Sequence, residues 1–177
     1  MKIAIITHVQ HIKSENCYFG YAPYVREMNI WLRYVDEVIV VAPWVFEELN
    51  PIHIAYEHPK VQFRNVKEFN ATSVVSAFKT LWVLPAVFRQ IYIAMQQADH
   101  IHLRCPGNMG LLAAVVQICF PKKKKTAKYA GNWDPKAKQP FTYKMQRWLL
   151  SNTFLTKNMQ VLVYGEWPKQ TSNIKPF

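Results

Sequence analysis

Two short runs of consecutive apolar residues constrain the fold of this chain most. They are IAIIT, at residues 3–7, and VIVVA, at residues 38–42. An uninterrupted apolar run of this length is typical of a strand that is buried on both faces, as in a parallel sheet. The segment between the runs carries apolar residues at the spacing of one buried helical face: Val25, Met28, Leu32 and Val35. Strand, helix and strand in this order form a βαβ unit.

The same alternation continues along the chain. Apolar segments predict further strands at residues 61–64, 100–104, 126–130 and 161–164. Helical patterns separate them at residues 74–97, 107–120 and 141–154. We expect Thr72 or Ser73 to cap the first of these helices, and Met145, Trp148 and Leu149 to face inward in the last. The predicted fold class is α/β, a doubly wound parallel sheet that is Rossmann-like and spans residues 1–177 as one domain.

The charge of the chain favours an anionic partner. Lys and Arg number 22 against 11 Asp and Glu, which gives a net charge of +11. Such an excess attracts phosphates, nucleic acid or an acidic membrane surface. Cys17, Cys105 and Cys119 share no short spacing, which suits a reducing compartment. The apolar run near the amino terminus is too short for the core of a signal peptide, and no apolar stretch has the length of a transmembrane helix.

The strand pattern also predicts where a ligand binds. In a doubly wound sheet, ligands bind outside the carboxyl ends of the strands. The loops at that edge contain the candidate substrate-binding residues His8, Tyr18, Gly20, Arg104, Asn108, Asn132, Trp133, Asp134 and Lys136. The Trp133 indole is suited to stacking on a sugar ring, while Asn132 and Asp134 can bind hydroxyl groups. The alternative is a structural turn in which Asp134 caps the next helix.

The position of Trp133 distinguishes these two interpretations. If Trp133 binds a ligand, we expect it to be partly exposed, near His8 or Tyr18 and near Arg104. Arg104 itself has two interpretations: it holds an anion beside the start of the following helix, or it pairs with a neighbouring carboxylate. Lys136 follows Asp134 on the same edge and is a candidate for a phosphate contact.

Four consecutive lysines, Lys122, Lys123, Lys124 and Lys125, lie before the predicted strand at residues 126–130. They are expected at the amino edge of the sheet, opposite the ligand edge. One interpretation is a solvated connection, and the functional interpretation is a membrane-facing contact with anionic lipid.

Several common sites are disfavoured by the sequence. The GxGxxG fingerprint and the P-loop pattern are both absent, which argues against a classical dehydrogenase or a P-loop NTPase. His100, His102 and Cys105 lie close together in the sequence, but their spacing matches no closed metal site. We therefore predict no metal, and we expect these histidines to bond the backbone or to lie at strand ends.

The chain resembles a known family in the order of its segments. MKIAIITH, FGYAPYVREMNIWL and VDEVIVVAP resemble the amino-terminal domain of retaining glycosyltransferases of the GT-B fold, the family 4 or group 1 class. The resemblance continues through ADHIHLRCPGNMGLLAAVV, TAKYAGNWDP, RWLLSNTFL and QVLVYGEWP. Where that family usually has a Gly-Gly pair, this chain has Phe19-Gly20, and Gly131 and Asn132 stand where it often has a histidine. No catalytic residue is therefore carried over.

The resemblance implies one half of a GT-B architecture. The chain would be the acceptor-binding half of a glycosyltransferase that moves a sugar from a nucleotide-sugar to a cell-envelope glycan or glycolipid. The donor-binding carboxy-terminal domain is absent from these residues, so we expect this chain alone to be inactive. The nucleotide-sugar is a substrate, and no cofactor is expected.

The expected location is cytoplasmic and peripheral at the inner face of the membrane. The alternative function is a membrane-associated, non-catalytic α/β module that recruits a partner. A nucleic-acid-binding role is ranked low and no nucleic acid is expected as a partner, because the basic residues are scattered and no recognition motif is present.

Overall fold

The central sheet has seven parallel strands in the part of the chain that the computed structural model describes, residues 1–15, 17–69 and 74–177. The strands are β1 (Lys2–Ile6), β4 (Glu37–Pro43), β6 (Val61–Val66), β7 (His100–Cys105), β8 (Lys124–Tyr129), β9 (Met159–Val163) and β10 (Ile174–Pro176). Their spatial order is β10-β9-β8-β7-β1-β4-β6, which is the order of a Rossmann fold with one strand added. The predicted α/β doubly wound parallel sheet is confirmed. The expected cap at Thr72 or Ser73 lies outside the described residues.

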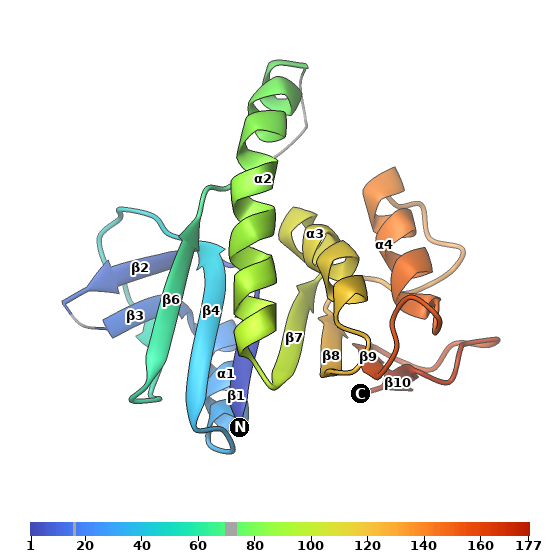
Figure 1. Ribbon diagram of the computed structural model, residues 1–177, viewed down its shortest axis with the longest axis horizontal. Helices are drawn as coiled ribbons and strands as arrows, with labels where there is room; N and C mark the ends of the chain where they lie inside the picture. Colours follow the sequence, from blue (N-terminus) through green and yellow to red (C-terminus); the bar gives the residue numbers. More distant parts are fainter. Residues whose placement is uncertain (16, 70–73) are drawn as a thin grey trace.

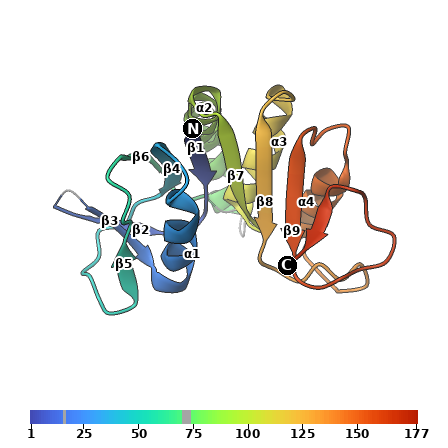
Figure 2. The same cartoon turned by 90° about the horizontal axis from the view of Figure 1, so that it is seen from below.

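Helices cover both faces of this sheet (Figures 1 and 2). Helix α1 (Ala22–Leu32) lies on one face, and α2 (Val74–Gln97), α3 (Asn108–Val116) and α4 (Phe141–Ser151) lie on the other. A 3₁₀ turn, Gln117–Cys119, continues α3. No described helix combines the length and the low polarity that crossing a membrane requires.

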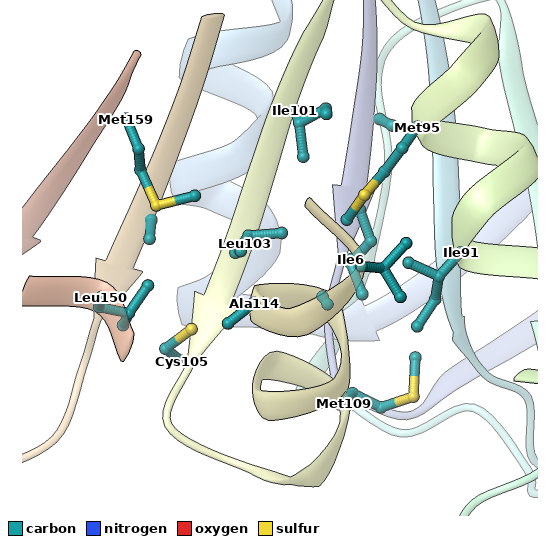
Figure 3. Packing of buried hydrophobic residues seen from close by; sticks show 14 of the residues in the cluster. Ile6, Ile91, Met95, Ile101, Leu103, Cys105, Met109, Ala114, Leu150 and Met159 are labelled. Carbon is teal, nitrogen blue, oxygen red and sulfur yellow. The ribbon is translucent and has the colours of Figure 1, made fainter. Parts of the chain in front are cut away.

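The core has one part on each face of the sheet. Figure 3 shows the larger part, in which Ile91 and Met95 of α2 pack with Ile6, Ile101 and Leu103 from the strands. On the other face, Val25, Met28 and Leu32 of α1 pack with alternate residues of β1 and β4: Ile3, Ile5, Val38 and Val40. Successive strand side chains point to opposite faces, so each apolar run fills both parts.

A second, smaller sheet lies in a region that the sequence pattern presents as a loop. It is antiparallel, with the order β2-β3-β5, and consists of β2 (His11–Ser14), β3 (Cys17–Tyr21) and β5 (His53–Ala55). The sequence pattern predicts no strand at residues 8–21, so this sheet is missed by the sequence-based prediction. These strands are short and mixed in polarity, and they are held by pairing across the sheet and by the buried stack of His11 on Tyr56, whose ring centroids are 5.6 Å apart.

Helix α4 is rotated relative to the sequence expectation. Leu149 faces inward as predicted, but Met145 and Trp148 are exposed, so that part of the prediction is wrong. Gln146 is buried in their place. Its amide group is satisfied there, because Oε1 accepts from the Gly107 N–H at 3.2 Å and Nε2 donates to the Cys105 sulfur at 3.2 Å.

Candidate functional site

The site follows from the topology of the sheet. Strands β1 and β7 are neighbours, but the chain leaves β1 toward α1 on one face and leaves β7 toward α3 on the other. The two connections diverge at the carboxyl edge and leave a crevice, the usual ligand position in this architecture. A cleft of about 220 Å³ lies there, and its lining residues are His8, Pro43, Glu68, Phe69, Pro106, Gly107, Asn108, Met109 and Tyr143.

His8 stands directly after β1 and is held against the turn before α3. Its Nδ1 would be only 3.2 Å from a Cβ atom at Gly107, and Gly107 has φ of +145°, which favours glycine. His8 keeps access to solvent, but partial burial of its ring lowers its pKa, the positive charge of Arg104 lowers it further, and Glu68 acts in the opposite direction. A neutral imidazole results near pH 7, with one nitrogen that donates and one that accepts.

Glu68 and Asn108 add polar groups to the same cleft. The Glu68 carboxylate accepts a hydrogen bond from the Gln10 side chain at 3.0 Å, and Asn108 Nδ2 donates to the Phe69 carbonyl at 2.9 Å. The sequence reasoning did not select Glu68 or Tyr143. The rule that strand carboxyl ends meet at one edge would have found Glu68, because it follows β6 by two residues.

The start of α3 is packed tightly against β7. A Cβ atom at Gly110 would lie 2.7 Å from the carbonyl oxygen of Arg104 and from Nε2 of Gln146. Glycine at this position therefore allows the helix to approach the strand. The N–H of Gly107 is already bonded to Gln146, so this amide is used by the fold.

Arg104 is engaged in an ion pair on the α1 side of the sheet. Its guanidinium lies 3.5 Å from Glu27 of α1, and Lys128 of β8 contacts the same carboxylate at 2.6 Å. Arg104 also lies over the Tyr24 ring, 5.5 Å from its centroid. Of the two interpretations of Arg104, the structure shows pairing with a carboxylate, although Arg104 still influences the charge of His8.

Tyr18 and Gly20 do not line the cleft. Tyr18 stacks on Phe63, with ring centroids 4.8 Å apart. Gly20 is buried, and a Cβ atom there would lie 3.0 Å from Val25 and 3.3 Å from the His11 ring. Gly20 therefore belongs to the packing between the small sheet and α1, and Tyr18 packs the small sheet against β6.

Trp133 is a core residue, so the expectation that it is partly exposed is wrong. Its side chain is 3% exposed, it meets the Tyr129 ring edge-on at 4.9 Å, and its indole N–H donates to Gln170 at 2.9 Å. Close contact between Gly131 and Pro106, where a Cβ atom would lie 2.9 Å from Cγ, sets the turn that precedes the indole. An indole enclosed in this way has no free face for a sugar ring.

The residues beside Trp133 form a structural turn. Asn132 accepts a hydrogen bond from the Asp134 N–H at 2.8 Å, and Asp134 accepts from the Lys136 N–H at 2.8 Å. Arg147 of α4 donates to the Asp134 carbonyl at 2.6 Å. A structural turn therefore describes this segment, but the expectation that Asp134 caps the next helix is wrong, because Pro140 is the N-cap of α4 and no described side chain caps it. Asn132 and Lys136 remain exposed at the carboxyl edge.

The four lysines lie at the amino end of β8, as expected, but they differ from one another. Lys122 and Lys124 are exposed. Lys123 turns inward and donates to three carbonyls at the end of α2, those of Met95, Gln96 and Ala98, at 2.7, 2.6 and 2.5 Å. Lys125 is 2% exposed and donates to the Phe120 carbonyl at 2.7 Å. Only two of the four are therefore free to contact a membrane.

The histidines of β7 share a partner on β8. His100 Nε2 and His102 Nδ1 lie 3.0 and 2.9 Å from the Thr126 hydroxyl oxygen. Burial lowers the pKa of His102 to about 3, so it is neutral. Among the described residues, no group of three His, Cys, Asp or Glu side chains is arranged to hold a metal ion.

No family model fits the chain, and no curated protein is significantly similar to it.

Proposed function

We propose that the chain is the acceptor-binding half of a glycosyltransferase that moves a sugar from a nucleotide-sugar to a cell-envelope glycan or glycolipid. The observation that carries the proposal is the cleft at the β1–β7 crevice. The family resemblance of the sequence supports the reaction class. The proposed location is cytoplasmic and peripheral at the inner face of the membrane.

The size of the cleft favours a small polar ligand. At about 220 Å³ it lies below the range of roughly 300–1,000 Å³ that is usual for drug-sized ligands. One sugar ring suits this space better than a complete nucleotide-sugar. The proposed donor site is therefore on a second domain that faces this edge.

The chemistry of the lining fits hydroxyl groups. A neutral His8 offers one donor and one acceptor, and the Glu68 carboxylate offers acceptors only. The Asn108 amide lines the same cleft, at the start of α3. These three side chains replace Asn132, Trp133 and Asp134 as the proposed acceptor-contacting set.

Titration of the ¹⁵N-labelled chain with methyl glycosides of glucose, galactose, mannose and N-acetylglucosamine tests the proposal. At least one glycoside is expected to shift the amide signals of Gly107 and Met109 and the ring signals of His8. The double variant H8A–N108A is expected to lose these shifts, whereas N132A, altered at an exposed residue outside the cleft, is expected to keep them. Failure of every glycoside, or equal shifts in H8A–N108A, would refute the proposed site.

The second candidate function is a membrane-associated module that has no catalytic role and recruits a partner. The observation in its favour is the distribution of charge: α2, α3 and α4 contain no Asp or Glu. Binding to anionic vesicles without any glycoside binding is the result that would favour this candidate over the first.

A further inference from the structure

The outer side of α4 is an exposed surface rich in aromatic residues. Phe141 and Trp148 are 77% and 62% exposed, and Met145 lies between them on the same stripe of the helix. Just beyond the helix, Phe154 is 75% exposed. We call these four residues, together with Lys144 and Lys157, the α4 face. Large apolar side chains gathered in this way on a folded domain usually mark a contact with a partner or a membrane.

The α4 face continues into an apolar groove. Met145 lines a hollow of about 280 Å³ with Leu111, Leu112 and Val115 of α3 and with Leu84 of α2. Figure 1 shows α3 between α2 and α4 on this side of the sheet. The surface therefore extends across three helices and is not confined to one exposed ring.

All the charged side chains of these three helices are basic. Their sequences contain Lys79, Arg89, Lys144 and Arg147, and no Asp or Glu. Lys157 follows α4 and lies over the Phe154 ring, with Nζ 5.0 Å from the centroid. Aromatic rings beside cationic groups, without carboxylates, match the boundary between acyl chains and anionic headgroups.

We propose that the α4 face docks on an anionic lipid surface, with Phe141, Trp148 and Phe154 entering the headgroup boundary and Lys144 and Lys157 meeting the headgroups. The inference is independent of the ligand of the β1–β7 cleft. It also moves the membrane contact away from the four consecutive lysines, since Lys123 and Lys125 bond carbonyls of the protein itself.

Charge complementarity selects this occupant over a second copy of the chain. In a twofold contact the same patch faces itself, so Lys144 and Lys157 would meet cations across the interface. The α4 face offers no carboxylate to pair with them. An anionic lipid surface supplies the missing negative charge.

Cosedimentation with vesicles of equimolar phosphatidylglycerol and phosphatidylcholine, compared with pure phosphatidylcholine, tests this proposal. The wild-type chain is expected to bind the anionic vesicles at least tenfold more strongly than the neutral ones. The variants W148S–F154S and K144E–K157E are each expected to reduce that binding tenfold or more. The matched control Y34S–F46S, which removes two exposed rings elsewhere, is expected to bind within twofold of the wild type.

Two further measurements sharpen the result. K122E–K124E alters the exposed lysines of the run and is expected to bind within about threefold of the wild type, and a larger loss than in K144E–K157E would overturn the assignment of the face. Brominated lipid is expected to quench less fluorescence in W148F than in the wild type, because Trp148 is the indole placed at the boundary.

Other outcomes overturn the proposal. Equal binding of W148S–F154S and the wild type would do so, provided that both melt at the same temperature. Equal binding to neutral vesicles would remove its electrostatic basis. Concentration-dependent dimerisation that W148S–F154S abolishes, without vesicle binding, would show that a second copy covers the face, and capture of an acidic protein without vesicle binding would assign it to a protein partner.

Discussion

Lys125 provides a direct test of the structure because it is a buried cation without a buried anion. Its ammonium group donates to the carbonyl of Phe120, the residue that follows the 3₁₀ turn after α3. Burial lowers the pKa of Lys125 from 10.5 to about 8. A lysine in a run of four is normally expected to be solvated. The burial of Lys125 is therefore a feature of the structure that the sequence pattern does not predict.

The pKa of Lys125 predicts how stability depends on pH. The folded chain gives up the proton near pH 8, whereas the unfolded chain keeps it until about pH 10.5. Between these values the unfolded state binds more protons, so the free energy of unfolding rises with pH. The cost of holding the charge is fully present below pH 8 and is lost progressively between pH 8 and about pH 10.5. From pH 7 to pH 10 the gain is up to about 2.5 kcal/mol.

Urea denaturation of the wild type and of K125M at pH 7 and pH 10 measures this gain. Contributions from other groups to the pH dependence are the same in both proteins and cancel in the difference. The free energy of unfolding of the wild type relative to K125M is expected to rise by about 1–2.5 kcal/mol from pH 7 to pH 10, with the smaller rise if water reaches the ammonium group. K124M, altered at the exposed neighbour, is expected to follow the wild type within about 0.5 kcal/mol. A constant difference between the wild type and K125M would refute the burial of the charge.

Three further predictions test other parts of the structure. K123M is expected to lower the free energy of unfolding by about 2 kcal/mol in urea denaturation, because Lys123 bonds three carbonyls at the end of α2; a loss no larger than that of K122M contradicts this. An NMR titration is expected to give His8 a pKa below 6.5 that rises in R104Q, because a neighbouring positive charge is removed; an unchanged midpoint argues against their proximity. The chain alone is expected to release no nucleotide from UDP- or GDP-sugars above background, because these residues are proposed to bind the acceptor and not the donor; clear release in a coupled nucleotide assay would disprove this.

The main sheet could be predicted because its signal is local. Each central strand is a short apolar run, as at residues 3–7 and 38–42, and both faces of such a strand are covered. The small sheet could not be predicted in the same way. Strand β2 has only four residues and includes the exposed Lys13, and β5 lies more than thirty residues from its partner β3. Its stability comes from contacts between distant segments, which leave no periodic pattern.

The orientation of α4 shows a second limit. Apolar residues lie on two sides of this helix, with Trp148 on one and Leu150 on the other, so the helical spacing does not decide which of them faces inward. The decision comes from Gln146, whose buried amide is satisfied by Gly107 and Cys105. Those partners are about forty residues away and become visible only when α4 is placed beside the start of α3.

The candidate site was predictable to the extent that topology determines it. His8 and Asn108 follow neighbouring strands, and the structure brings both into one cleft; their binding of a ligand stays a prediction. Trp133 follows the next strand, and the same rule placed it at the same edge. The rule gives the position of the backbone, but it does not give the direction of a side chain, and the Gly131 turn sends the indole into the core.

Helix α4 connects the two proposals because it contributes to both surfaces. Tyr143 lines the cleft, while Phe141 and Met145, two residues away on either side, belong to the α4 face. The separation is therefore about one helix diameter, roughly 10 Å. A lipid-linked acceptor could keep its chain in the bilayer while its sugar reaches His8.

We therefore expect W148S–F154S to bind soluble methyl glycosides like the wild type, but to lose binding to a glycolipid presented in anionic vesicles. Equal loss of binding to both ligands would show that the substitutions damage the cleft itself. Unchanged binding of both ligands would show that the α4 face does not contribute to acceptor binding.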